Sequence, residues 1–272
     1  MLMRRVPLLT NAGCVPVVES AAVDQDGRRI PVRMPDERAL TLFLDKREIV
    51  TLMTLGQRPE ALALGYLLNQ GLLDNSDVVT AVQVDWETAA AAVTTAGGAA
   101  ASRRADLLAK RTVTAACGQG TQFGDPMARL PVLPAGPATG RSALLALTDR
   151  VRRHDTIYKR SGSVHGCALA YGADILHYVE DIGRHNAVDS VAGLMALDDL
   201  DARTLLLYTT GRLTSEMLIK AVGMGIPVVM SRSGTTAMGL AVARRCNLTV
   251  VGRARSGRFQ VFHGAERIAF DA

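Results

Sequence analysis

Hydrophobic and polar positions in the first half of the chain predict strands packed around a helix. The expected elements are strands at 39–44 and 48–55, a helix from Pro59 towards Gly71, a strand around Val82–Trp86 and a short helix at 103–110. The first two strands flank a charged corner, so we expect a hairpin. A proline at the start and a glycine after the end are helix punctuation. The residues before Ala39 and the alanine-rich stretch 89–101 predict no regular element.

In the second half, apolar runs of strand length alternate with stretches of helix length. Expected strands lie at 164–170, 175–179, 204–210, 226–230 and 248–252, and expected helices begin at Ser142 or span 184–197, 214–222 and 235–246. Strands that alternate with helices of this length imply parallel crossovers and a sheet covered by helices. The sequence therefore predicts an α/β domain in this half.

A stretch rich in glycine and proline separates the two halves. Residues 117–140 hold five glycines and four prolines in 24 positions. Connections of this length are usually functional or mobile. We therefore predict a smaller N-terminal α+β domain at 1–116, a flexible loop at 117–140 and an α/β domain at 141–272.

Composition and charge narrow the class of protein. A chain of 272 residues with 48% hydrophobic and 21% charged residues can bury a substantial core. The net charge of +5 is uneven, because the residues from Arg203 onward contain ten Lys/Arg against three Asp/Glu, a local excess of +7. A local basic surface suits a phosphate or a nucleotide.

The number of cysteines and the hydropathy of the chain indicate the cellular compartment in which the protein functions. The four cysteines are too few and too scattered for a disulfide framework or for a zinc site with paired ligands. We therefore expect a reducing, cytoplasmic setting. The apolar stretch near the start is too short for a secretion signal, and no window of 18 apolar residues exists, so we expect no membrane span.

Cys117 is the candidate nucleophile. It stands at the entrance of the glycine-rich loop, next to Gly118 and before Gly120 and Gly124. Small neighbours leave a sulfur open to approach by a partner. The alternative interpretation is a small buried hydrophobe, which is what a lone cysteine usually is. The other three cysteines lie in a predicted tail or in apolar elements and are weaker candidates.

The densest polar cluster combines His165 with the run Glu180–Asn186. The run sits between a predicted strand and a predicted helix, where ligands of α/β sheets collect and where backbone N–H groups face an anion. Arg184 and His185 are therefore candidate ligand-binding residues, with His185 as a base or a phosphate donor. Helix capping with a surface ion pair explains the same residues equally well.

A basic turn, residues 253–258, follows the strand expected at 248–252. Guanidinium groups beside a glycine turn fit phosphate oxygens in a bidentate way, although many basic turns are simply solvated. The candidate phosphate-binding residues of this segment are Arg253, Ala254, Arg255, Ser256, Gly257 and Arg258. The SGTT run at 233–236 opens a helix, and for it we favour capping over phosphate binding.

With these residues in hand, the chain closely resembles the FdhD family of formate dehydrogenase accessory sulfurtransferases. The resemblance extends from about Glu37 to Arg267. Its most specific parts are EDIGRHNAVD at 180–189, the SEMLIKAVGMGIPVVMSRSGTTAMGLAVA stretch from Ser215, and RCNLTVVGRARSGR from Arg245. It implies that the second domain has a cytidine-deaminase-like α/β fold, without the zinc signature of that fold.

The resemblance also implies a function. Cys117 would accept persulfide sulfur from a cysteine desulfurase and transfer it to the molybdenum bis(molybdopterin guanine dinucleotide) cofactor, which formate dehydrogenase needs. The substrate cofactor would bind at Arg253–Arg258 together with Arg184, His185 and His165, with GDP as a surrogate ligand. A cytoplasmic homodimer without a metal site, a nucleic-acid partner or a membrane contact is expected.

Two departures from the family pattern bear on this function. Gly120 stands where many members carry the second cysteine of a C-x-x-C, and Ser190 stands where a lysine is common. One cysteine is chemically sufficient, because transfer needs only attack on the outer sulfur. The missing cysteine nevertheless leaves open an alternative, a chaperone that loads the cofactor without transferring sulfur. RNA binding is a weaker interpretation, because aromatic residues make up only 4% of the chain and provide no platform on which RNA bases could stack.

Overall fold

The first sheet of the computed structural model has five strands in the order β1-β6-β7-β4-β5. The structure describes residues 6–74, 77–105, 111–113, 121–123, 130–154 and 156–270. The strands are β1 (Leu8–Leu9), β4 (Arg38–Leu44), β5 (Arg47–Thr54), β6 (Val79–Asp85) and β7 (Ala90–Thr95), and the helices beside them are α1 (Pro59–Asn69) and α2 (Ala100–Arg103). The expected β4–β5 hairpin is confirmed, because these strands pair antiparallel.

Helix α1 forms the core of this half together with the sheet. Pro59 occupies its first turn, and the chain turns away at Gly71, where φ is 68°. Proline needs no hydrogen-bond partner in a first helical turn, and glycine adopts positive φ without strain. Leu40 and Leu42 of β4 and Leu67 of α1 are fully buried in one cluster.

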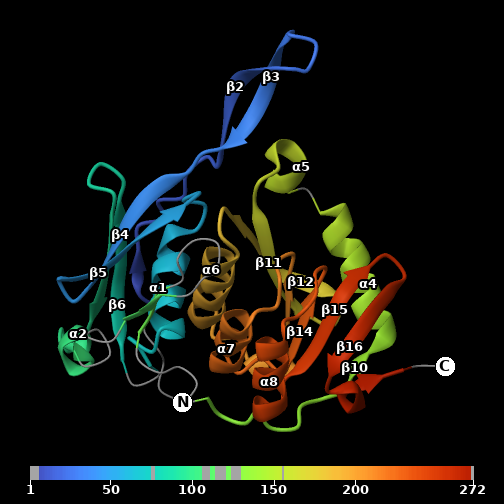
Figure 1. Cartoon of the computed structure of the whole chain (residues 1–272). Helices are drawn as coiled ribbons and strands as arrows, with labels where there is room; N and C mark the ends of the chain where they lie inside the picture. The colour runs from blue at the N-terminus through green and yellow to red at the C-terminus, as the bar shows by residue number, and fades with distance from the viewer. Residues whose placement is uncertain are drawn as a thin grey trace.

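One strand and one two-stranded ribbon of this half were not expected from the sequence. Strand β7 forms in the alanine-rich stretch because it pairs with β6 on one side and β4 on the other. Strands β2 (Val17–Val23) and β3 (Arg29–Pro35) form a two-stranded ribbon that projects from the body (Figure 1). The expectation of an irregular start is therefore wrong. Residues Thr10 and Ala12 are also fixed, since they hydrogen-bond to Val84 and Trp86.

The second sheet has six strands in the order β12-β11-β13-β14-β15-β16. They are β11 (His165–Tyr171), β12 (Asp174–Asp181), β13 (Leu206–Thr209), β14 (Val228–Ser231), β15 (Thr249–Arg255) and β16 (Arg258–His263). Only β13, β14 and β15 pair in parallel. The parallel crossovers expected from the alternation of strands and helices are confirmed for these three strands, whereas short turns join β11 to β12 and β15 to β16 as antiparallel hairpins.

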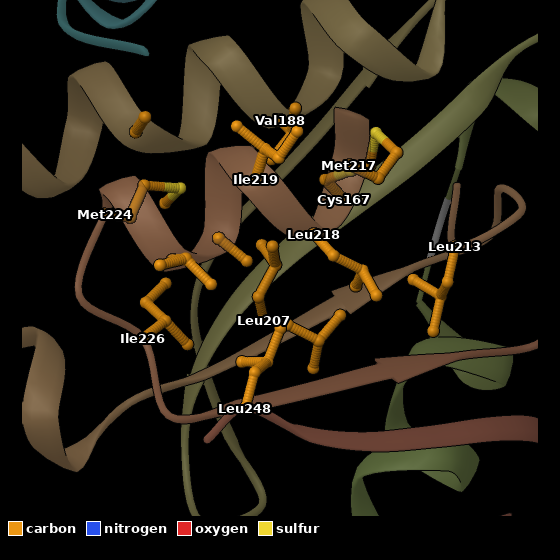
Figure 2. Packing of buried hydrophobic residues seen from close by; sticks show 14 of the residues in the cluster. Cys167, Val188, Leu207, Leu213, Met217, Leu218, Ile219, Met224, Ile226 and Leu248 are labelled. Carbon is orange, nitrogen blue, oxygen red and sulfur yellow. The ribbon is translucent and has the colours of Figure 1, made fainter. Parts of the chain in front are cut away.

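Helices cover both faces of the second sheet. They are α4 (Arg141–Arg153), α5 (Ile157–Ser161), α6 (Arg184–Leu197), α7 (Ser215–Gly223) and α8 (Ala237–Cys246). One buried cluster joins α6, α7 and α8 to the sheet, and Figure 2 shows its side chains from α6, α7 and the strands beneath them. A second cluster joins α4 to the opposite face. The mixed α/β fold class is confirmed.

The smaller segments complete the chain. They are β8 (Arg111–Val113), β9 (Thr121–Phe123), β10 (Thr139–Gly140), β17 (Ile268–Ala269) and the 3-10 turns η1 (Ala202–Thr204) and η2 (Ala265–Arg267). Most of the expected short helix at 103–110 lies outside the described residues, as do 114–120 and 124–129. The domain division at 117–140 and the cytidine-deaminase-like character of the second half stay predictions.

Two glycines let α1 and α6 pack closely side by side in the middle of the molecule (Figure 1). A Cβ added to Gly193 would lie 1.9 Å from the carbonyl oxygen of Ala61, and one added to Gly65 would lie 1.8 Å from that of Asp189. Real Cβ atoms do not approach backbone so closely. The helices therefore touch through backbone atoms.

We expect Gly193→Ala to lower the free energy of unfolding by about 1–3 kcal/mol, because the new methyl forces α1 and α6 apart. Chemical denaturation measures this. Gly223→Ala is the matched control, because nothing lies within 4 Å of its added Cβ and alanine favours helix. Equal stability of the two variants would contradict the close-packed junction.

Candidate functional site

The carboxyl ends of β12, β13, β14 and β15 and the amino end of β11 lie along one edge of the second sheet. Register brings them together, since His165 pairs with Asp181 and Thr209 pairs with Ser231. The Arg232 amide donates to the Thr209 carbonyl oxygen at 3.2 Å. In α/β sheets this is the edge where ligands bind. The predicted ligand-binding segments all meet here.

Side-chain alternation divides this edge between the two faces of the sheet. Successive strand residues point to opposite faces. Cys167, Val179, Leu207 and Val229 pack with α6 and α7, whereas Ala168, Tyr178, Tyr208 and Met230 pack with α4. The same parity places Glu180 and Arg232 on the α4 face, and His165 and Asp181 on the α6 face. The predicted residues therefore form two groups rather than one.

A cavity of about 310 Å³ opens on the α4 face. Of the predicted cofactor-binding residues it contains Ala254, Arg255 and Ser256. Its other lining residues come from α4, α5 and the strand ends: Thr148, Val151, Arg152, Thr156, Tyr158, Lys159, Val164, Gly166, Tyr178, Glu180, Tyr208, Thr210 and Arg232. A cavity of this size and mixed lining suits a small polar ligand.

The charges in the cavity are mostly positive. Among the lining residues that the structure describes, Arg152, Lys159, Arg232 and Arg255 occur together with one carboxylate, Glu180. Burial raises the pKa of Glu180, while hydrogen bonds from the backbone N–H groups of α5 counteract that shift. The carboxylate thus helps to hold the first turn of α5 in place. The four cations can therefore act together on an anion.

Aromatic rings form part of the same wall. The Arg232 guanidinium carbon lies 5.5 Å from the centre of the Tyr158 ring, in cation–π range. Burial, followed by the charge of Glu180, raises the pKa of the Tyr178 hydroxyl, so this phenol stays neutral. A planar base and an anionic phosphate would both find partners in this wall.

The remaining residues of the basic turn lie outside the cavity lining. Arg253 and Arg258 are exposed, and Gly257 turns the chain with φ of 75°. The ladder between β15 and β16 shifts register between Gly252 and Arg255, and Arg253 adopts φ of 52°. This bulge interrupts the strand beside the cavity. Arg253, Gly257 and Arg258 stay candidates, but the lining of this cavity does not include them.

Residues 180–186 form the junction expected from the sequence. Strand β12 ends at Asp181 and α6 begins at Arg184. Arg184 is buried at 3% exposure. His185 Nε2 lies 3.0 Å from Glu216 Oε2 on α7. Burial lowers the pKa of His185 and Glu216 counteracts this, so the imidazole belongs to a buried polar contact between two helices.

Comparison with known proteins identifies the family of this chain. Residues 35–269 match the FdhD/NarQ family. The chain belongs to the FdhD/NarQ family. The sulfur carrier protein FdhD of Bacillus subtilis (strain 168) is 29% identical over 245 residues, covering 88% of this chain and 92% of that protein. The sulfur carrier protein FdhD of Listeria monocytogenes serotype 4b (strain F2365) is 28% identical over 236 residues, covering 85% and 90%.

A solved structure agrees with this placement. The crystal structure of a proposed formate dehydrogenase accessory protein from Desulfotalea psychrophila superposes with a TM-score of 0.76 at 26% identity, covering 93% of this FdhD/NarQ chain and 98% of that one. The family resemblance expected from the sequence is therefore confirmed. Among the helices that the structure describes, none has the length and apolar content needed to cross a membrane.

Cys117, the nucleophile expected in this FdhD/NarQ chain, lies outside the described residues, and its role stays a prediction. Strands β8 and β9, which flank it in the sequence, pair antiparallel. Cys167 and Cys246 are fully buried, and Cys14 is half-buried. Burial raises the pKa of the Cys167 thiol to about 12. Cys167 belongs to the apolar cluster shown in Figure 2.

We expect Cys167 and Cys246 to resist an added thiol reagent in the folded protein, because burial keeps both thiols protonated and inaccessible. Mass spectrometry after alkylation, with and without denaturant, checks this. Both should be modified only in denaturant. Modification of Cys167 in the native protein at the rate of Cys14 would contradict the buried placement.

Asp181 links the junction to the first sheet. Its carboxylate accepts hydrogen bonds from Thr54 Oγ1 at 2.5 Å, from the Leu55 amide at 3.3 Å and from Asn186 Nδ2 at 3.0 Å. Asn186 also donates to the Met53 carbonyl at 2.6 Å. Burial raises the pKa of Asp181 to about 6, against the lowering effect of these hydrogen bonds. Asp181, a titratable residue, therefore connects this edge of the second sheet to the end of β5 through hydrogen bonds.

The raised pKa of Asp181 predicts a pH-dependent stability. Between about pH 4 and pH 6 the folded state binds this proton and the unfolded state releases it, so stability falls by roughly 2–3 kcal/mol as pH rises through this window. Asp181→Asn should flatten that slope in denaturation curves measured across it. Asp174→Asn, at an exposed position, is the control. An unchanged slope in Asp181→Asn would contradict the assignment.

Several cavity residues were not expected from the sequence. Arg152, Tyr158 and Lys159 come from α4 and α5, far along the chain from the basic turn. Arg232 follows an apolar strand directly, which was the one available signal for it. The SGTT run that comes next is a helix cap, as expected, since Thr236 Oγ1 accepts a hydrogen bond from the Gly239 amide.

Proposed function

We propose that this protein accepts persulfide sulfur from a cysteine desulfurase on Cys117 and transfers it to the molybdenum bis(molybdopterin guanine dinucleotide) cofactor. This transfer would support the maturation of formate dehydrogenase. Membership of the FdhD/NarQ family over residues 35–269 carries the proposal. The names of the relatives, sulfur carrier protein FdhD, support it. A cytoplasmic homodimer is part of the same proposal.

The cavity on the α4 face supplies the chemistry for holding the cofactor as a substrate. Arg152, Lys159, Arg232 and Arg255 would bind the phosphate oxygens of one guanine dinucleotide. The Tyr158 ring, next to the Arg232 guanidinium, offers a flat surface for the base. GDP carries the same base and phosphates and serves as a surrogate ligand.

The first transfer, from one cysteine to another, needs no change in net oxidation state. The Cys117 thiolate attacks the outer sulfur of the desulfurase persulfide, forming a new S–S bond while the donor S–S bond breaks. The desulfurase cysteine leaves as a thiolate. The sulfur would then move from the Cys117 persulfide to the molybdenum centre of the substrate. The S–S bond breaks, the reduced metal centre supplies the two electrons that convert the outer sulfur to sulfide, and Cys117 leaves as a thiolate. Only nucleophilic attack on the outer sulfur is required at each step.

We expect Arg232→Ala to weaken GDP binding roughly tenfold or more, because it removes a charge-assisted contact and the neighbour of the Tyr158 ring. Isothermal titration calorimetry measures this. Arg203→Ala is the control, since Arg203 is exposed, pairs with Asp201 and lies outside this cavity. Unchanged GDP affinity in Arg232→Ala would place the nucleotide elsewhere.

Complementation tests the whole proposal. A cell that lacks its own carrier should regain formate dehydrogenase activity when it expresses this chain. Failure of the well-folded chain to restore any activity would overturn the proposed function. Restored activity that does not depend on Cys117 would instead favour a chaperone that loads the cofactor without transferring sulfur.

A further inference from the structure

Three cationic residues belong to segments that neighbour His165 at the site edge, and none of them belongs to the basic turn. Arg184 begins α6, Arg212 follows β13 and Arg232 follows β14. Backbone contacts hold these segments together, since the Thr210 amide donates to the Gly166 carbonyl at 2.9 Å. The four side chains, which we call the His165 cluster, therefore come from four neighbouring strand ends.

The His165 cluster has a buried base and an exposed rim. Arg184 is 3% exposed, and its aliphatic part packs against Gly211, where an added Cβ would lie 2.9 Å from Arg184 Cδ. His165 is half-buried, whereas Arg212 and Arg232 are exposed. The imidazole is therefore partly accessible to solvent.

The electrostatic field at His165 is positive. Burial lowers the pKa of His165 first, and Arg184, Arg232, Arg212 and His185 lower it further in that order. All of these charged neighbours are cationic groups or an imidazole. An anion placed beside the ring would lower the energy of all of them together.

The nearby carboxylates already have contacts of their own. Asp181 accepts hydrogen bonds from Thr54, Leu55 and Asn186. Glu216 Oε2 lies 3.0 Å from His185 Nε2. Asp189 forms an ion pair with Lys220.

The backbone adds to this field. Helix α6 spans 14 residues, and its N-cap, Gly183, provides no side-chain hydrogen bond to the first turn. The N-terminal end of a helix carries a partial positive charge and exposed N–H donors. This supports, but does not by itself create, a preference for an anion.

We propose that His165, Arg184, Arg212 and Arg232 form a subsite for a small dianion, a tetrahedral oxyanion or its sulfur-substituted analogue, next to the nucleotide cavity. Arg232 contributes to both sites. The inference deepens the proposed function, because a substrate held by its nucleotide in the cavity could place a second anionic group here. The same chemistry would equally take a free inorganic dianion.

Molybdate at low ionic strength is the probe. We expect calorimetry to show one molybdate per chain, with binding weakened at least tenfold in Arg212→Ala and within twofold of wild type in Arg203→Ala. Arg255→Ala, which lies on the α4 face, should lower GDP affinity and leave molybdate affinity within twofold. Absence of molybdate binding, or equal binding by Arg212→Ala and wild type, would overturn the subsite.

Imidazole titration gives a second readout. The chain has five histidines, few enough to follow individually by NMR with labelled histidine. Molybdate should raise the pKa of His165, since a bound dianion stabilises the protonated ring. An unmoved His165 in the presence of bound molybdate would contradict the placement of the ion.

Prior saturation with GDP separates the two sources of the anion. If the His165 cluster is a distinct subsite, the GDP complex still binds one molybdate per chain, with lower affinity because Arg232 is shared. If GDP abolishes molybdate binding, the cluster holds nucleotide phosphates and the separate subsite is wrong. Neither result depends on Cys117, so failure of sulfur transfer and failure of this inference are distinguishable.

Discussion

Replacing Cys117 with alanine is expected to abolish the restoration of formate dehydrogenase activity in a cell that lacks its own carrier. The variant loses the sulfur atom that would carry the persulfide. Gly120 stands at the position where many family members have a second cysteine, so no neighbouring thiol in the CGQG run can replace it. The expected activity is that of cells without any carrier.

Cys14→Ala is the matched control for this experiment, because it removes the half-buried thiol and leaves Cys117 in place. It should retain the activity of the unaltered chain. Activity in Cys117→Ala comparable with the control would contradict the persulfide mechanism and support a chaperone that loads the cofactor without transferring sulfur.

Lys220→Met is expected to lower the free energy of unfolding by about 3–5 kcal/mol, because it leaves a buried carboxylate without its cation. The Lys220 Nζ lies 2.8 Å and 2.7 Å from the two carboxylate oxygens of Asp189, and Asn69 Nδ2 donates to the same carboxylate at 2.7 Å. These contacts join α7, α6 and α1. Chemical denaturation measures the loss.

The double variant Lys220→Met/Asp189→Leu distinguishes an uncompensated charge from lost packing. Replacing both partners with apolar groups removes the buried charge, so the double variant should regain much of the lost stability. Asn69 then faces an apolar side chain, which limits the recovery. A double variant less stable than Lys220→Met would contradict the electrostatic explanation.

Local sequence signals predicted four helices of the second half and missed the short helix α5. Helix α6 spans Arg184–Leu197, as expected, and α4, α7 and α8 begin within two residues of their expected starts. Each of these four helices follows a glycine or threonine N-cap, namely Gly140, Gly183, Thr214 and Thr236. Such signals depend only on neighbouring residues, so they can be recognised from a single sequence.

Elements that depend on distant partners were not predicted. Strand β7 consists of alanine, valine and threonine residues, and pairing with β6 and β4 rather than local pattern makes it a strand. The ribbon β2–β3 exposes residues on both faces, so it lacks the alternation that marks a half-buried strand. The antiparallel hairpins of the second sheet were not predicted either, because they depend on how the strands pair in space.

The candidate site was predicted in part. The basic turn and the β12–α6 junction do lie at one sheet edge, as strand-to-helix punctuation suggested. Their separation onto opposite faces depends on whether each residue is odd or even in the register, which a single sequence does not specify. The contribution of α4 and α5 to the cavity depends on long-range packing, which no local sequence pattern predicts.

The most direct test of the account is mass spectrometry of the protein after incubation with a cysteine desulfurase and cysteine. The account predicts a mass gain of one sulfur atom that maps to Cys117, disappears with a reductant and does not occur in Cys117→Ala. A Cys117 that remains unmodified while the desulfurase is active, in protein that still binds GDP, would contradict the account.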